Sequence, residues 1–142
     1  MGFTRSQIIQ SALDLVGVRF LHQGRDPATG LDCVGLLVEV GKRVEYPHVD
    51  DVAAYRRVPS AEVIRQMLHA TTDEIALDDV RDGDVYLMRM GGIKPRHVGF
   101  AANYNGRASV LHASASGVRV EDKTNFPASW FVAAFRLRGV LD

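Results

Sequence analysis

The sequence contains three residues whose side chains together could carry out nucleophilic catalysis. Cys33 is its only cysteine, and His97 and His112 lie in two later segments that we predict to be neighbouring strands. A thiol, an imidazole that removes its proton and a second imidazole that orients the first form a nucleophile, base and orienter. These three residue types therefore indicate acyl transfer through a thiolate.

The pKa of the Cys33 thiol is expected to be subject to two opposing influences. Residues 33–41 form an apolar run that we interpret as a helix, with Asp32 as its N-cap and Gly41 as its end. A helix N-terminus lowers the pKa of a thiol, whereas the negative charge of Asp32 raises it. Gly35 leaves room for the close approach of a strand or a substrate. The structural alternative is that Cys33 is a small buried core residue, as free cysteines often are.

The two histidines are expected to face the same side of a sheet. Asn105-Gly106 is a strong signal for a tight hairpin turn between their strands. His97 lies 8 residues before Asn105 and His112 lies 6 residues after Gly106, so they are offset by 8 − 6 = 2 residues. Side chains alternate between faces along a strand, so this offset keeps both imidazoles on one face. Two hydrogen-bonded histidines without a catalytic role are the structural alternative.

The same three side chains could instead bind zinc, because one cysteine and two histidines form a known catalytic ligand set. The sequence has no closely spaced zinc motif such as H-E-x-x-H and offers no evident fourth ligand. We therefore expect neither a metal nor another cofactor. A single cysteine also excludes an intramolecular disulfide and a multi-cysteine metal cluster.

Hydrophobic periodicity predicts helices followed by strands, which is the α+β pattern, in a single domain over residues 1–142. Thr4 and Gln7 form a capping box ahead of an amphipathic run that stops at Gly17. The acidic stretch 73–84 is expected to be a solvated loop that leads into a strand. The expected elements are helices at 5–16, 33–41 and 60–69, and strands at 84–90, 97–103, 109–113, 117–121 and 130–137.

The composition of the chain limits the classes of partner that it can bind. Its 142 residues include 17 Lys and Arg against 17 Asp and Glu, which argues against a broadly basic nucleic-acid surface. No apolar stretch approaches the ~18 residues of a membrane span, and the N-terminus lacks the pattern of a signal peptide. We therefore expect no nucleic-acid partner, no membrane partner and synthesis in the cytoplasm.

Five segments of the chain, within a likeness that runs from about residue 5 to 137, resemble the NlpC-like cell-wall peptidases. These are papain-like cysteine peptidases of bacteria and their phages. Each segment alone is a weak signal, but their order along the chain is specific. The segments are Phe20-Leu21-His22-Gln23-Gly24-Arg25, Gly30-Leu31-Asp32-Cys33-Val34-Gly35-Leu36-Leu37, Asp82-Gly83-Asp84-Val85, Arg96-His97-Val98-Gly99-Phe100 and Val110-Leu111-His112-Ala113.

The resemblance implies a papain-like α+β fold, with N-terminal helices packed on an antiparallel sheet of five or six strands. It implies cleavage of amide bonds in peptidoglycan stem peptides, often between D-glutamate and a diamino acid. Cys33 would be the nucleophile, His97 the general base and acid, and His112 the orienting residue. The residues expected to contact the substrate are Phe20, His22, Asp32 and Arg96.

Two positions depart from the family pattern. Phe20 stands where relatives commonly have Tyr, and Val34 where they commonly have Ser, so two polar groups near the nucleophile are lost. The variant motifs look most like those of phage or prophage tail-associated members, which implies tail proteins as partners and a place on the virion or at the cell wall. Two alternatives stay open: a catalytically silent structural or binding component of a phage tail, and an acyltransferase on the same fold.

Overall fold

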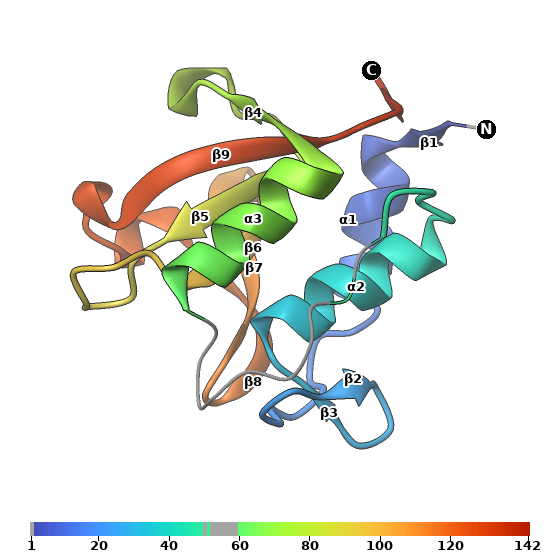
Figure 1. Cartoon of the computed structure of the whole chain (residues 1–142), viewed down its shortest axis with the longest axis horizontal. Helices are drawn as coiled ribbons and strands as arrows, with labels where there is room; N and C mark the ends of the chain where they lie inside the picture. Colours follow the sequence, from blue (N-terminus) through green and yellow to red (C-terminus); the bar gives the residue numbers. More distant parts are fainter. Residues whose placement is uncertain (1, 50, 52–59) are drawn as a thin grey trace.

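The computed structural model describes residues 2–49, 51 and 60–142, and an antiparallel sheet forms its centre (Figure 1). Over these residues the sheet has six strands in the order β4-β9-β5-β6-β7-β8. The neighbouring strands from β5 to β8 follow one another along the chain, so they form a meander. The strands are β4 (Thr72–Ile75), β5 (Val85–Met88), β6 (His97–Tyr104), β7 (Arg107–Ser114), β8 (Gly117–Asp122) and β9 (Phe131–Leu137).

Three α-helices in the described part of the chain supply the other layer: α1 (Arg5–Leu13), α2 (Cys33–Arg43) and α3 (Ala61–Thr71). Each begins at a residue whose side chain accepts a hydrogen bond from a free backbone N–H of the first turn. These N-caps are Thr4, Asp32 and Ser60, and Thr4 with Gln7 forms the predicted capping box. The predicted α+β architecture is confirmed.

Short elements complete the fold. Strand β1 (Phe3–Thr4) pairs in parallel with β10 (Val140–Leu141), which brings the two ends of the chain together (Figure 1). Strands β2 (Arg25–Asp26) and β3 (Gly30–Leu31) form a small hairpin just before α2. The 3-10 helices are η1 (Leu77–Asp79), η2 (Lys123–Asn125) and η3 (Ala128–Trp130).

Several predicted boundaries were wrong. The first helix ends at Leu13 rather than residue 16, so Val16 lies 46% exposed instead of on the buried face. Helix α2 continues through Gly41 to Arg43, and Glu45 with a φ of 57° adopts the left-handed backbone just after it. Gly41 lies inside the helix, and a Cβ there would lie 2.6 Å from Cγ2 of Val49.

The sequence suggested that the acidic stretch 73–84 is a loop, but part of it forms a strand. Its first residues form β4, which pairs with β9 at one edge of the sheet. The burial pattern of β4 has only Thr72 buried, because an edge strand can leave most of its side chains in water. This polar pattern explains why periodicity did not reveal the strand.

The two faces of the sheet bury different sets of side chains. The face under the helices carries the main core, to which Val98, Phe100 and Leu111 belong together with Cys33 and residues of all three helices. The opposite face carries a smaller aromatic cluster: Tyr86, Met88, Ala101, Val110, Phe126, Phe131 and Ala134. Over the described residues, no helix is long and apolar enough to cross a membrane.

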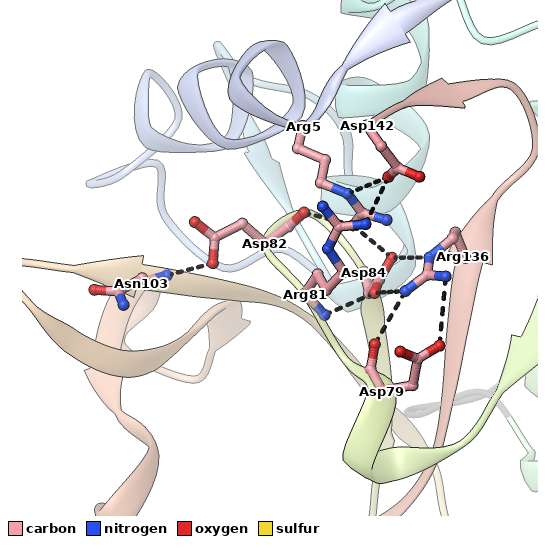
Figure 2. Close-up of polar contacts among 8 residues, drawn as sticks. All are labelled: Arg5, Asp79, Arg81, Asp82, Asp84, Asn103, Arg136 and Asp142. Carbon is pink, nitrogen blue, oxygen red and sulfur yellow. Dashed lines mark hydrogen bonds and ion pairs between the residues drawn. The ribbon is translucent and has the colours of Figure 1, made fainter.

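A buried carboxylate, Asp84, ties the start of β5 to both ends of the chain (Figure 2). It is 1% exposed and accepts hydrogen bonds from Arg5 Nη1 at 3.0 Å and from Arg136 Nη2 at 2.9 Å. The backbone N–H of Arg81 donates to the same carboxylate at 2.8 Å. The bond with Asp84 raises the pKa of Arg136. The Asp82-Gly83-Asp84-Val85 segment therefore has a structural role at this position.

Candidate active site

The sheet brings His97 and His112 into direct contact. Strands β6 and β7 are joined by Asn105 and Gly106, whose φ values of 51° and 77° are those of the tight turn predicted for this hairpin. The resulting register places both imidazoles on one face, with His97 Nε2 2.8 Å from His112 Nδ1. The same-face prediction is confirmed.

His112 is fully enclosed, with 0% of its surface exposed. One side of its ring meets Phe126, whose ring centre lies 5.7 Å away at nearly a right angle. Its second nitrogen, Nε2, lies 3.5 Å from Oε1 of Glu121 on the adjacent strand β8. His112 is therefore held between His97 and Glu121 and has little freedom to turn.

The thiol of Cys33 approaches the sheet from the helical side. Cys33 begins α2, and its side chain is 6% exposed. The backbone N–H groups of Cys33, Val34 and Val98 surround the sulfur. Because Val98 directly follows His97 in β6, the thiol lies near the start of the strand that carries His97.

The charge state of the Cys33 thiol in the resting protein differs from the one that the helix N-terminus alone would favour. Burial, and then the Asp32 carboxylate, raise the pKa of Cys33 to about 12, against the surrounding backbone N–H groups. Burial, and then the neighbouring His112, lower the pKa of His97 to about 3. Burial also lowers the pKa of His112. The thiol and both imidazoles are therefore uncharged near pH 7.

Asp32 organises the loop that precedes the nucleophile. Its Oδ1 accepts a hydrogen bond from Gly35 N at 2.8 Å and an ion-pair contact from Arg25 Nη1 at 3.1 Å. Its Oδ2 accepts from the backbone N–H of Gln23 at 3.0 Å. These contacts give Asp32, 3% exposed, a structural role. Its assignment to substrate binding stays a prediction.

The same loop approaches the first turn of α2 very closely. A Cβ added at Gly35 would lie 2.0 Å from the carbonyl oxygen of Gly24. No other residue type fits there without a backbone shift, because real Cβ atoms do not come this close to an oxygen. The close neighbour of Gly35 is thus the preceding loop, rather than the strand or substrate that the sequence suggested.

The other residues expected to contact the substrate lie at the surface. Phe20, which forms an isolated parallel β-bridge with Leu31, is 38% exposed, and His22 is also exposed. Arg96 is exposed directly before His97, and its backbone N–H donates to Met88 O at 3.1 Å. Their exposure leaves these side chains accessible to a ligand, and their roles stay predictions.

The lowered pKa of His97 predicts that the stability of the fold decreases in mild acid. The pKa of His97 is lowered from 6.5 to about 3 in the folded chain, so the unfolded chain binds more protons below pH 6.5. Stability is therefore complete above pH 6.5 and is lost progressively as the pH falls towards 3. In thermal melts, His97→Asn should reduce the drop in Tm between pH 7 and pH 5 relative to wild type. A drop of the same size in both proteins would contradict the lowered pKa of His97 in the folded chain.

The sequence analysis did not identify Glu121, although the strand register could have predicted its position. Strand β8 pairs with β7 so that His112 lies opposite Arg119, and Glu121 lies two residues further on the same face. Counting from the turn before Gly117 would have placed a carboxylate beside the imidazole.

Among the residues that the structure describes, no three His, Cys, Asp or Glu side chains are grouped so as to hold a metal ion.

Comparisons with known proteins agree on one family. The sequence profile described as the NlpC/P60 family matches residues 17–136. No curated protein matches the sequence of the chain.

The architecture resembles that of the NlpC/p60 domain of the peptidoglycan hydrolase SagA, with a TM-score of 0.68, 19% identity and coverage of 94% of this chain and 99% of that one. A Staphylococcus aureus Mu50 protein of the NLP/P60 family, described as similar to lipoprotein, has a TM-score of 0.65 and 20% identity over 97% of this chain and 42% of its own. An NlpC/P60 family protein from Bacillus cereus ATCC 10987 has a TM-score of 0.68 and 16% identity over 96% and 41%. The chain thus spans less than half of the last two proteins.

Proposed function

Because the chain belongs to the NlpC/P60 family, we propose that it is a cysteine peptidase that hydrolyses amide bonds in peptidoglycan stem peptides. The imidazole pair, with His97 Nε2 2.8 Å from His112 Nδ1, carries this proposal. One structural neighbour, SagA, is described as a peptidoglycan hydrolase, which supports the cell-wall substrate. The buried thiol at the start of the strand that carries His97 supports the cysteine mechanism.

The reaction begins with uncharged groups. With the pKa of Cys33 raised to about 12 and that of His97 lowered to about 3, a lone charge on either group is unfavourable. His97 therefore removes the thiol proton as sulfur attacks the amide carbonyl, so that the negative and positive charges form together. This is general-base catalysis and does not require a thiolate in the resting protein.

The remaining steps return every group to its starting state. The carbonyl oxygen becomes an oxyanion that accepts from the backbone N–H of Cys33 at the helix start. His97 transfers its proton to the departing amine, and an acyl thioester remains on Cys33. Water, deprotonated by His97, attacks the thioester, and the carboxylate product leaves as the thiol regains its proton.

Product analysis tests this function. Purified peptidoglycan incubated with the protein should yield fragments with a new amine and a new carboxylate inside the stem peptide, detected by mass spectrometry. The glycan strands should keep their original reducing ends. New reducing ends in the glycan, with intact stem peptides, would contradict an amide hydrolase.

A silent binding module is the second candidate, and the enclosed thiol with its raised pKa is the observation that favours it. Undigested peptidoglycan with both wild type and Cys33→Ala, together with retention of both proteins on the wall, would support that alternative. An acyltransferase would instead transfer the stem peptide to an added amine, and the product mass distinguishes it from hydrolysis. Phage tail proteins as partners, and synthesis in the cytoplasm before action at the wall, stay predictions from the sequence.

A further inference from the structure

The environment of His112 differs at its two ring nitrogens. Nδ1 faces Nε2 of His97 at 2.8 Å, whereas Nε2 faces Oε1 of Glu121 at 3.5 Å. Nε2 is completely buried, and the described residues offer it no closer partner. At 3.5 Å the contact with Glu121 is longer than a formed hydrogen bond. A small movement of the partly exposed Glu121 side chain, 21% accessible, would close it.

The contact between the two histidines allows two arrangements of protons. In the first, His97 donates from Nε2 to His112 Nδ1, which leaves His97 Nδ1 without a proton and able to take one from the thiol. In the second, His112 donates from Nδ1 to His97 Nε2, and the proton of His97 lies on Nδ1. Only the first arrangement leaves His97 able to act as the base, because a neutral imidazole has one donor and one acceptor nitrogen.

A carboxylate beside His112 Nε2 favours the first arrangement. A carboxylate accepts hydrogen bonds and cannot donate them, so it stabilises the tautomer in which His112 carries its proton on Nε2. That tautomer has a free electron pair on Nδ1, which then accepts the proton of His97 Nε2. Glu121 thereby favours the Nε2-protonated tautomer of His112, and His112 in turn favours the Nε2-protonated tautomer of His97.

We propose that Glu121 is a positioning residue that sets the tautomers of His112 and His97 and so prepares His97 to accept the thiol proton. The catalytic effect of this role rests on the proposed function. The arrangement of tautomers itself depends only on the contacts within the fold.

The remaining charged and titratable neighbours of His112 lie on β8 and β6. On β8, Arg119 lies directly opposite His112, and its Nε is 3.4 Å from the same Oε1 of Glu121. Arg119 is 52% exposed and forms an ion pair with the carboxylate, and its positive charge contributes to the lowered pKa of His112. From β6 the facing group is His97, and the ring of Phe126 closes the remaining side.

The tautomers can be measured directly in the resting protein. Because the pKa values of both imidazoles are lowered, both are neutral at pH 7. In protein labelled with ¹⁵N-histidine, two-bond nitrogen–proton correlations then report which ring nitrogen carries the proton. We expect His112 and His97 to be protonated on Nε2 in wild type. In Glu121→Ala, the Nδ1-protonated form of His112 should become populated. Unchanged tautomers in that variant would overturn the role of Glu121.

Kinetics on a stem-peptide substrate provide a second readout. Glu121→Ala should lower kcat about 10-fold with little change in KM, because a smaller share of the protein has an available base. Glu121→Gln keeps an oxygen acceptor and should restore kcat to within about 3-fold of wild type. Equal losses in the two variants would overturn the assignment.

Glu74→Ala is the matched control. Glu74 forms a similar pair with a histidine, His69, at 3.8 Å on the exposed edge of the sheet. Its removal should change neither kcat nor the tautomers of His97 and His112, and a change in either would point to a general effect of lost charge. The spectra need no substrate. A protein that fails to cleave stem peptides would therefore refute the proposed function, while the spectra would still decide the role of Glu121.

Discussion

Cys33→Ala is expected to lower the turnover of a stem-peptide substrate by at least about 10⁴-fold, because no other group can form the acyl intermediate. The substitution removes only a sulfur atom at a small, buried position, so the N-cap at Asp32 and the packing of α2 should persist. Release of the new amine measures turnover, and thermal unfolding checks that the variant is folded.

Cys33→Ser provides the matched control for that experiment. Serine keeps nearly the shape of the side chain, but its hydroxyl is a much weaker nucleophile beside a neutral imidazole. It should fold like wild type and share the loss of turnover. A folded Cys33→Ala protein that retains turnover within about 10-fold of wild type would show that the thiol is not the nucleophile.

Asp84→Ala is expected to lower the free energy of unfolding by about 3–5 kcal/mol, because it removes the buried anion that two partly buried arginines share. Arg5 and Arg136 converge on this carboxylate from the two ends of the chain, as Figure 2 shows. Whole domains are stable by only about 5–15 kcal/mol, so this loss would remove a large part of the total. Urea unfolding followed by circular dichroism measures it.

The neighbouring Asp82 is the matched control for Asp84. Its carboxylate accepts one hydrogen bond from the backbone N–H of Asn103 at an exposed position. Asp82→Ala should therefore cost no more than about 1 kcal/mol. Similar losses in the two variants would contradict the view that burial and convergence of the arginines make Asp84 important.

Local sequence rules predicted the elements whose signals are local. The caps at Thr4, Asp32 and Ser60 marked where the helices begin, and Asn105-Gly106 marked the hairpin that brings the imidazoles together. These signals need only residues a few positions apart. They were sufficient to place His97 and His112 on one face.

Features that depend on distant segments were not predicted. The edge strand β4 exists because β9 offers it a partner, and its own residues are mostly polar and exposed. The raised pKa of Cys33 arises from the depth at which α2 is buried, and no residue next to it in the sequence reveals that depth. Arg5 and Arg136 meet at Asp84 although they lie at opposite ends of the chain.

Detection of the covalent intermediate tests the central claim most directly. Wild-type protein mixed with a stem peptide and quenched in acid during turnover should gain the mass of the acyl fragment, and peptide mapping should locate that mass on Cys33. Cys33→Ala should gain none. Cleavage of the stem peptide that proceeds equally in both proteins, with no added mass on Cys33, would contradict a cysteine peptidase.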